Sequence, residues 1–294
     1  MGVAGSNPAS STIFCPIDKV SRPQISTILK LLDDENQEVQ NSVQQALLDY
    51  HGDASDDLAA VGIQLSPEDS SLLSKSLHSG RQTSLREHWS VPFRSLQDPD
   101  GDWDALEALL RLLSDFLHDG ITLRPSMSDE LDLLAKEAEN QVESPAELSE
   151  WLFASDRFSG NKTNPYDPRN SDLAWCLEQR KSNPLGLSLI YLLVAQRIGL
   201  PVYGVNYPGH FLCLIDLEVA PTLVDPFHRG RPIPVMQLLK EHPEISKKAA
   251  EAVRRPCSLA AILTRVLANM TLAFSKLNRL DDADLIQNLM KTIK

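Results

Sequence analysis

Residues 184–227 read PLGLSLIYLLVAQRIGLPVYGVNYPGHFLCLIDLEVAPTLVDPF. Pro184 suits the first turn of a helix and Gly199 suits its end, so a helix is expected between them. Two short strands should follow, one starting at His210 and the next ending at Asp225. A histidine at the start of one strand and an aspartate at the end of its neighbour can lie side by side. This is how a general base and its orienting carboxylate are often held.

The expected nucleophile of such a site is missing from the sequence. At the start of the helix the chain reads Lys181-Ser182-Asn183-Pro184-Leu185-Gly186, without a cysteine. Cys176 belongs to a different helix, and Cys213 should lie on the strand face opposite His210, so both are expected to be core thiols. Ser182 is the favoured nucleophile for a Ser/His/Asp arrangement. Ser188 is less favoured, because it lies one turn inside the helix, where a packing role is expected.

His210 and Asp225 also have a structural interpretation. His210 follows Pro208-Gly209 and could bridge backbone groups in a turn, while Asp225 precedes Pro226 and could cap one. Asn170 and Tyr166 are expected to brace loops rather than to contact a substrate.

Outside this stretch, apolar periodicity predicts mainly helices. The clearest is amphipathic and has Asp100 or Asp102 as its N-cap candidate. The expected helices are 103–116, about 128–140, one beginning at Ser144-Pro145, and about 172–180 with Ser171 as its cap.

The N-terminal part predicts a pair of helices. Apolar residues recur at helical spacing over 25–32 and 39–50, a pattern that resembles one HEAT-type repeat and fits a plain helical hairpin equally well. Residues 53–97 are polar and less periodic, so short helices and a connection are expected there.

Composition and charge disfavour several classes of partner and site. The 294 residues carry a net charge of −12, which disfavours nucleic acid and anionic membranes as partners. The four cysteines lack Cys-x-x-Cys spacing, so neither a zinc knuckle nor a disulfide framework is indicated. No metal and no cofactor are expected. No run of eighteen apolar residues and no secretory signal is found, which makes a cytoplasmic protein the expectation.

Several motifs occur together and in order: Phe158-Ser-Gly-Asn161, Tyr166-Asp-Pro-Arg-Asn-Ser171, Arg197-Ile-Gly-Leu-Pro-Val202, Pro208-Gly-His-Phe-Leu212 and Val224-Asp-Pro-Phe227. The chain from about residue 101 to 294 thereby resembles the SirB invasion-regulator branch of the transglutaminase-like superfamily. The segment 262–283 is similar to the tetratricopeptide-like helix pair found there.

The resemblance implies an α+β, predominantly helical fold with a transglutaminase or papain-like core, a long helix packed on a small antiparallel sheet. His210 matches the family's base and Asp225 its orienting acid, whereas the family's cysteine falls at or next to Pro184. The expected organisation is a flexible leader (1–20), a helical HEAT-like region with a connection (21–97), a transglutaminase-like domain (98–240) and tetratricopeptide-like helices (241–294).

Two functions are compatible with these observations. The favoured one is a non-catalytic transglutaminase-like protein that binds a protein or peptide partner as a scaffold or regulator. The alternative is a peptide or amide hydrolase or acyl transferase that uses His210 and Asp225 with a serine, Ser182 first, or with water.

Overall fold

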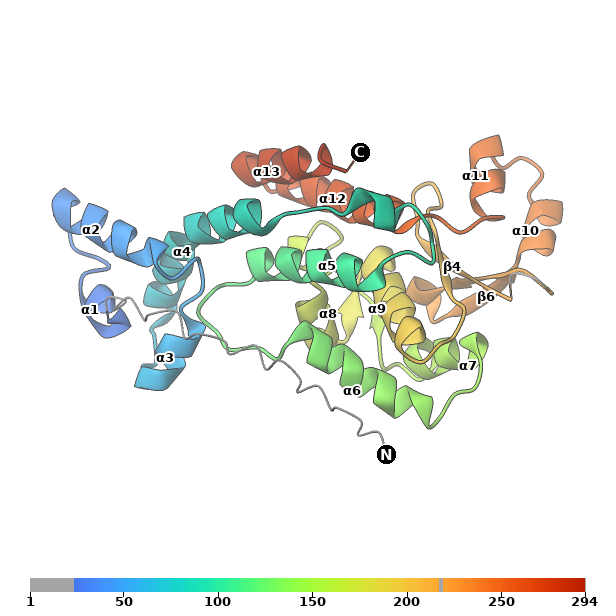
Figure 1. Cartoon of the computed structure of the whole chain (residues 1–294), viewed down its shortest axis with the longest axis horizontal. Coiled ribbons are helices and arrows are strands. Elements are labelled where there is room, and N and C mark those ends of the chain that lie inside the picture. The colour runs from blue at the N-terminus through green and yellow to red at the C-terminus, as the bar shows by residue number, and fades with distance from the viewer. Residues whose placement is uncertain (1–23, 217–218, 294) are drawn as a thin grey trace, which may run out of the picture.

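A computed structural model describes residues 24–216 and 219–293. The protein is mostly helical and contains one four-stranded antiparallel sheet and one two-residue parallel strand pair (Figure 1). The expected fold class, α+β and predominantly helical, is therefore confirmed. The expected leader (1–20) and Cys15 lie outside the described residues.

The elements follow one another with short connections. The helices are α1 (Ile25–Lys30), α2 (Gln37–Leu48), α3 (Ser55–Val61), α4 (Pro67–His88), α5 (Trp103–Leu117), α6 (Met127–Glu139), α7 (Pro145–Ser149), α8 (Leu173–Gln179), α9 (Pro184–Arg197), α10 (Val235–Glu241), α11 (Lys247–Ala252), α12 (Leu259–Lys276) and α13 (Leu280–Met290). Single helical turns are η1 (Phe93–Leu96), η2 (Glu150–Ala154), η3 (Pro168–Ser171) and η4 (Pro226–His228). The strands are β1 (Ser159–Gly160), β2 (Lys181–Ser182), β3 (Tyr203–Val205), β4 (Leu212–Ile215), β5 (Thr222–Asp225) and β6 (Arg231–Pro234).

The four-stranded sheet has the order β3-β4-β5-β6 and is covered on both faces. Because side chains alternate along a strand, Cys213 and Val224 enter the main core together with α9, while Leu214 and Leu223 form a smaller core with α10 and α11. Helix α9 is buried over almost its whole length, which explains why it carries no charge before Arg197. The long helix packed on a small sheet is thus present.

Helices α5 and α6 confirm the elements expected at 103–116 and 128–140. Asp102 is the N-cap of α5, and its side chain accepts a hydrogen bond of 2.9 Å from the backbone N–H of Ala105. The expected cap of α8 was wrong by one residue. Asp172, not Ser171, accepts the bond from Trp175 N, at 3.1 Å.

Residues 53–97 contain the expected short helices α3 and η1, but about half of the segment forms the unexpected 22-residue helix α4. Its buried stripe runs through Leu73, Leu77 and Leu85, but the position between the last two is Arg81. A charged residue in the buried stripe interrupts the helical spacing of apolar residues, so the helix is not recognised from the sequence pattern.

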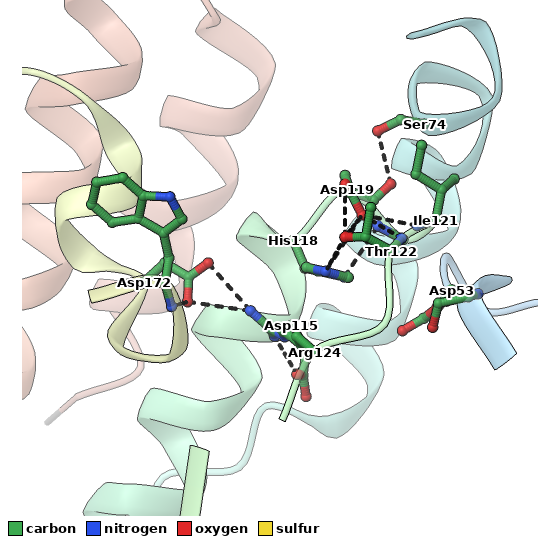
Figure 2. Close-up of polar contacts among 12 residues, drawn as sticks. Asp53, Ser74, Asp115, His118, Asp119, Ile121, Thr122, Arg124 and Asp172 are labelled. Atoms are coloured by element: carbon green, nitrogen blue, oxygen red, sulfur yellow. Dashed lines mark hydrogen bonds and ion pairs between the residues drawn. The ribbon is translucent and has the colours of Figure 1, made fainter. Parts of the chain in front are cut away.

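Arg81 stays in the stripe because backbone carbonyl groups accept hydrogen bonds from the two terminal nitrogens of its guanidinium. It donates to Gly52 O at 3.1 Å, to Asp119 O at 2.9 Å and to Ser74 O at 3.0 Å. Ser74 Oγ also donates to Asp119 O, at 2.7 Å, as Figure 2 shows. The α5–α6 connection is therefore fastened to α4, although the two are distant in sequence.

The same connection is fastened to the core by Arg124. Its guanidinium lies 2.8 Å from Asp115 Oδ1 and 3.3 Å from the buried Asp172 carboxylate (Figure 2). Burial and the Arg124 charge lower the pKa of the neighbouring His118. Together with the Arg81 and Ser74 bonds, these contacts join the α5–α6 connection to both α4 and the core. The expected domain boundaries stay predictions.

Among the described residues, α12 is the one helix long and apolar enough to cross a membrane, with a mean hydropathy of 1.2 over its 18 residues. Half of that window is buried within the protein, as in core helices that pass the same test. The helix is therefore weak evidence for a membrane span.

Helix α13 packs against α12 (Figure 1). The buried carboxylate of Asp282 also ties it to α4. Asp282 Oδ1 lies 2.8 Å from His78 Nε2 and accepts a 2.7 Å bond from Gln82, while Arg279 lies 2.6 Å from Oδ2. Burial would raise the pKa of Asp282, but the bonds from His78 and Gln82 lower it to about 2.

We expect Asp282→Asn to lower the free energy of unfolding at pH 7 by about 1–2 kcal/mol, allowing for solvent screening. Because the folded-state pKa is below the unfolded-state value, the carboxylate stabilises the fold at and above pH 4. This stability is lost as the pH falls from about 3.8 towards 2. Urea unfolding at pH 7, 5 and 3 checks this, with the exposed Asp284→Asn as control. A gap between wild type and Asp282→Asn that stays constant down to pH 3 would rule the account out.

Candidate functional site

The structure brings His210 and Asp225 together. His210 follows a turn in which Gly209 has a φ of +76°, and its N–H donates to Tyr207 O at 3.1 Å. Asp225 ends β5 in the strand next to β4. His210 Nε2 lies 3.0 Å from Asp225 Oδ1, so the contact expected from the strand order is present. The catalytic role of the pair stays a prediction.

Asp225 also holds a second imidazole. His228 Nδ1 lies 2.7 Å from Asp225 Oδ2, and the His228 N–H donates to Oδ1 at 3.3 Å. Burial would raise the pKa of Asp225, but the hydrogen bonds and charge of His210, followed by those of His228, hold it below its ordinary value. Asp225 is therefore a carboxylate at neutral pH.

His210 opens onto a cleft between segments distant in the sequence. The walls are the 165–171 loop, the start of α9, the turn before β4 and the middle of α12. The lining residues include Tyr166, Ser171, Pro184, Arg265 and Leu272. No cysteine lines this cleft within residues 24–216 and 219–293.

The N-terminus of α9 forms the wall where the family resemblance places a cysteine. Pro184 is the first residue of the helix, where its missing N–H costs nothing. Asn183 is the N-cap, and its Oδ1 accepts a 2.8 Å hydrogen bond from Gly186 N. This end of the helix is closed by its own cap and presents no thiol to His210.

Ser182 does not reach the cleft. It is fully buried, and its hydroxyl donates to Asn170 O at 2.9 Å while accepting from Cys176 Sγ at 3.1 Å. Burial raises the pKa of Cys176 far above that of a free thiol. Both side chains pack beneath the α9 N-terminus, which disfavours Ser182 as a nucleophile.

Ser188 and Cys213 are also buried away from the cleft. Ser188 Oγ donates to Pro184 O at 2.8 Å, one turn back in its own helix. Cys213 is fully buried between β4 and α9, and burial raises the pKa of its thiol well above the ordinary value. The interpretation of Cys213 and Cys176 as core thiols matches their burial.

Asn170 and Tyr166 differ in their placement. Asn170 accepts from Asn161 Nδ2 at 2.9 Å and donates to Asn164 O at 2.9 Å, so it braces its loop. Tyr166 lies in the cleft wall with 44% of its surface exposed, and Lys276 Nζ lies 5.7 Å from its ring centre. Tyr166 is therefore available for contact with a bound molecule.

Sequence reasoning missed several residues of this region. His228 lies one turn beyond Asp225, and its contact depends on the short η4 turn rather than on a motif. Arg265 and Asn269 reach the cleft from α12, and Arg265 also donates to Asn206 Oδ1 at 2.8 Å. Their spacing from His210 follows from helix packing, so no sequence pattern pointed to them.

Residues 125–268 match the family described as the transglutaminase-like superfamily. The matched segment contains α9, the four-stranded sheet, His210 and Asp225, so the protein carries a domain of this superfamily. The match begins just before α6 and ends within α12, a shorter range than the expected 101–294. Helices α1 to α5 and α13 lie outside it.

The chain is similar to a UPF0162 protein of Xylella fastidiosa, with 35% identity over 144 residues, which is 47% of this chain and 51% of that protein. A UPF0162 protein of Pseudomonas aeruginosa is 31% identical over 33% of this chain and 37% of its own length. The human F-box only protein 21 is 36% identical over 21% of this chain and 10% of its own length. The chain spans about half the length of the first of these relatives. No solved structure matches it significantly.

Proposed function

We propose that this transglutaminase-like domain is non-catalytic and binds a segment of a protein partner in the His210 cleft. The observation that carries the proposal is the wall at the start of α9. The family resemblance puts the thiol nucleophile at or next to Pro184, the first residue of this helix, and no cysteine lines the cleft in the described part of the chain.

The polar chemistry around His210 supports binding without bond cleavage. Asp225 and His210 keep the geometry of a base and its orienting acid, but retained geometry does not require retained activity. The hydroxyls of Ser182 and Ser188 are already hydrogen-bonded to carbonyl groups.

The cleft has features suited to a peptide. Leu272 and Tyr166 expose 49% and 44% of their surfaces and provide apolar contact area, while Arg265 and Asn269 offer donors beside them. The flanking helices, HEAT-like at α1 and α2 and tetratricopeptide-like at α12 and α13, would extend the binding surface. The net charge of −12 disfavours nucleic acid and anionic membranes, so the proposed partner is a protein, and the proposed location is the cytoplasm.

The alternative function is a peptide or amide hydrolase or an acyl transferase. The 3.0 Å contact between His210 and the ionised Asp225 favours it, because the pair could deprotonate water or a hydroxyl. Ser171 lines the cleft, whereas Ser182 is buried beneath it, so Ser171 or water is the better-placed nucleophile.

A photo-crosslinking amino acid at Leu272 tests the binding proposal. We expect it to form covalent adducts with a small set of proteins in an extract of the source cells, because Leu272 lies in the cleft wall and is half exposed. Mass spectrometry identifies the adducts.

The matched control is the same amino acid at Leu133, an exposed leucine of α6 that does not line the cleft. Adducts should be absent there, and Tyr166→Ala should weaken those formed at position 272. Identical adducts at both positions, or none at either, would refute a partner in the cleft.

A further inference from the structure

His210, Asp225 and His228 form a compact cluster of ligand atoms. Each residue offers one ligand atom, a ring nitrogen or a carboxylate oxygen, and these three atoms lie within 4.8 Å of one another. A base-and-acid pair needs only one imidazole on Asp225, namely His210. His228 also contacts Asp225 but does not line the cleft. The second histidine is therefore not explained by the chemistry of the cleft.

The donor set suits a divalent transition-metal ion. Two imidazole nitrogens and one carboxylate are the ligands of open sites for Zn²⁺ and non-haem Fe²⁺. Metal–ligand bonds of about 2.0–2.2 Å at tetrahedral angles place ligand atoms about 3.3 Å apart. The N···O distances are 3.0 Å from His210 to Oδ1 and 2.7 Å from His228 to Oδ2, which are hydrogen-bond lengths, so the two rings would move slightly outward to admit an ion.

The backbone holds these ligands in fixed positions. The η4 turn joins Asp225 to His228, and Gly230 N closes it by donating to Asp225 O at 2.9 Å. The ring of Phe227 meets both imidazoles edge-on, with centroid distances of 6.3 Å to His210 and 5.4 Å to His228. The site is therefore built on a strand end and a closed turn.

The cluster is open to solvent. His228 has 54% and His210 has 23% of its side chain exposed, so water could complete the coordination. The neighbouring Arg229 is turned away, with its guanidinium 3.0 Å from Asp156 and 2.9 Å from Ala154 O.

We propose that His210, Asp225 and His228 bind one divalent transition-metal ion of the Zn²⁺ type. Each neutral imidazole coordinates through the nitrogen that faces Asp225 and carries its proton on the other ring nitrogen. The bound ion would fix the His210 ring in the cleft wall. The inference goes beyond the proposed function and does not depend on what the cleft binds.

Co²⁺ is the probe, because its visible absorption reports its ligands. The full chain with Cys15→Ser, which removes a competing thiol, is titrated with Co²⁺. We expect one ion per chain, a spectrum without thiolate charge transfer, and displacement by Zn²⁺. His228→Ala should weaken binding at least about tenfold, as should His210→Ala. Circular dichroism verifies that both variants fold.

His242→Ala is the matched control, because His242 is similarly exposed and faces Glu244 at 3.0 Å but belongs to no such cluster among residues 24–216 and 219–293. Its Co²⁺ affinity should equal that of the parent chain. The proposal is overturned if the parent binds no Co²⁺ or Zn²⁺, or if the folded His228→Ala binds Co²⁺ with unchanged affinity and spectrum. Neither outcome affects the crosslinking result, since His228 lies outside the cleft.

Discussion

Replacing Phe211 with alanine should lower the free energy of unfolding by about 3–5 kcal/mol. Phe211 is 1% exposed and follows His210 directly, so its ring fixes the start of β4 in the core. The packing around the ring leaves no spare room. A Cβ added at Gly204 would lie 3.0 Å from Phe211 Cζ and 3.1 Å from Ile262 Cδ1. Urea unfolding followed by circular dichroism measures the loss.

Two variants calibrate this prediction. Phe211→Leu retains most of the volume and should cost less, and Leu272→Ala, half exposed in the same cleft, should cost under about 1 kcal/mol. A Phe211→Ala variant within 1 kcal/mol of wild type would show that His210 is not held by this packing.

Placing a cysteine at position 184 should create a reactive thiolate. The first turn of α9 directs its positive dipole end at this position, and His210 lies in the same cleft. We expect the pKa of the introduced thiol to fall from about 8.5 to about 7 or lower, which raises the thiolate fraction at pH 7 by about 15-fold. The pH dependence of iodoacetamide alkylation, localised by mass spectrometry, measures this pKa.

Leu272→Cys provides the comparison, because it places a thiol in the same cleft on α12, away from a helix N-terminus. Its pKa should stay near that of a free cysteine. Adding His210→Ala to the Pro184→Cys variant should raise the pKa. Equal alkylation rates at both positions would mean that the start of α9 lacks the expected electrostatic environment.

Local patterns in the sequence predicted much of the fold. Helix α5 follows from an uninterrupted apolar stripe with an aspartate cap, and α9 follows from a proline at its start and a glycine after its end. These signals depend only on residues close in the chain. The long helix α4 was missed because Arg81 breaks its stripe, and two of the three carbonyl groups that accept hydrogen bonds from Arg81 come from distant loops.

The candidate site also contains residues whose placement local patterns predict and residues whose placement they do not. The pairing of His210 with Asp225 was predictable, since neighbouring antiparallel strands place the start of one beside the end of the next. The burial of Ser182 beneath Asn170 and the approach of Arg265 from α12 depend on helix packing, which no local pattern encodes. The metal ligand His228 depends on the backbone path of a single turn.

The most direct test of a cleft without a nucleophile is labelling with broad thiol- and serine-directed activity probes, read out by peptide mass spectrometry. Wild-type protein, Pro184→Cys and His210→Ala are treated side by side. We expect no labelled residue in the cleft of the wild type and rapid labelling of the introduced cysteine in Pro184→Cys. Labelling of wild-type Ser171 or Ser182 that disappears in His210→Ala would contradict the account and establish an enzyme.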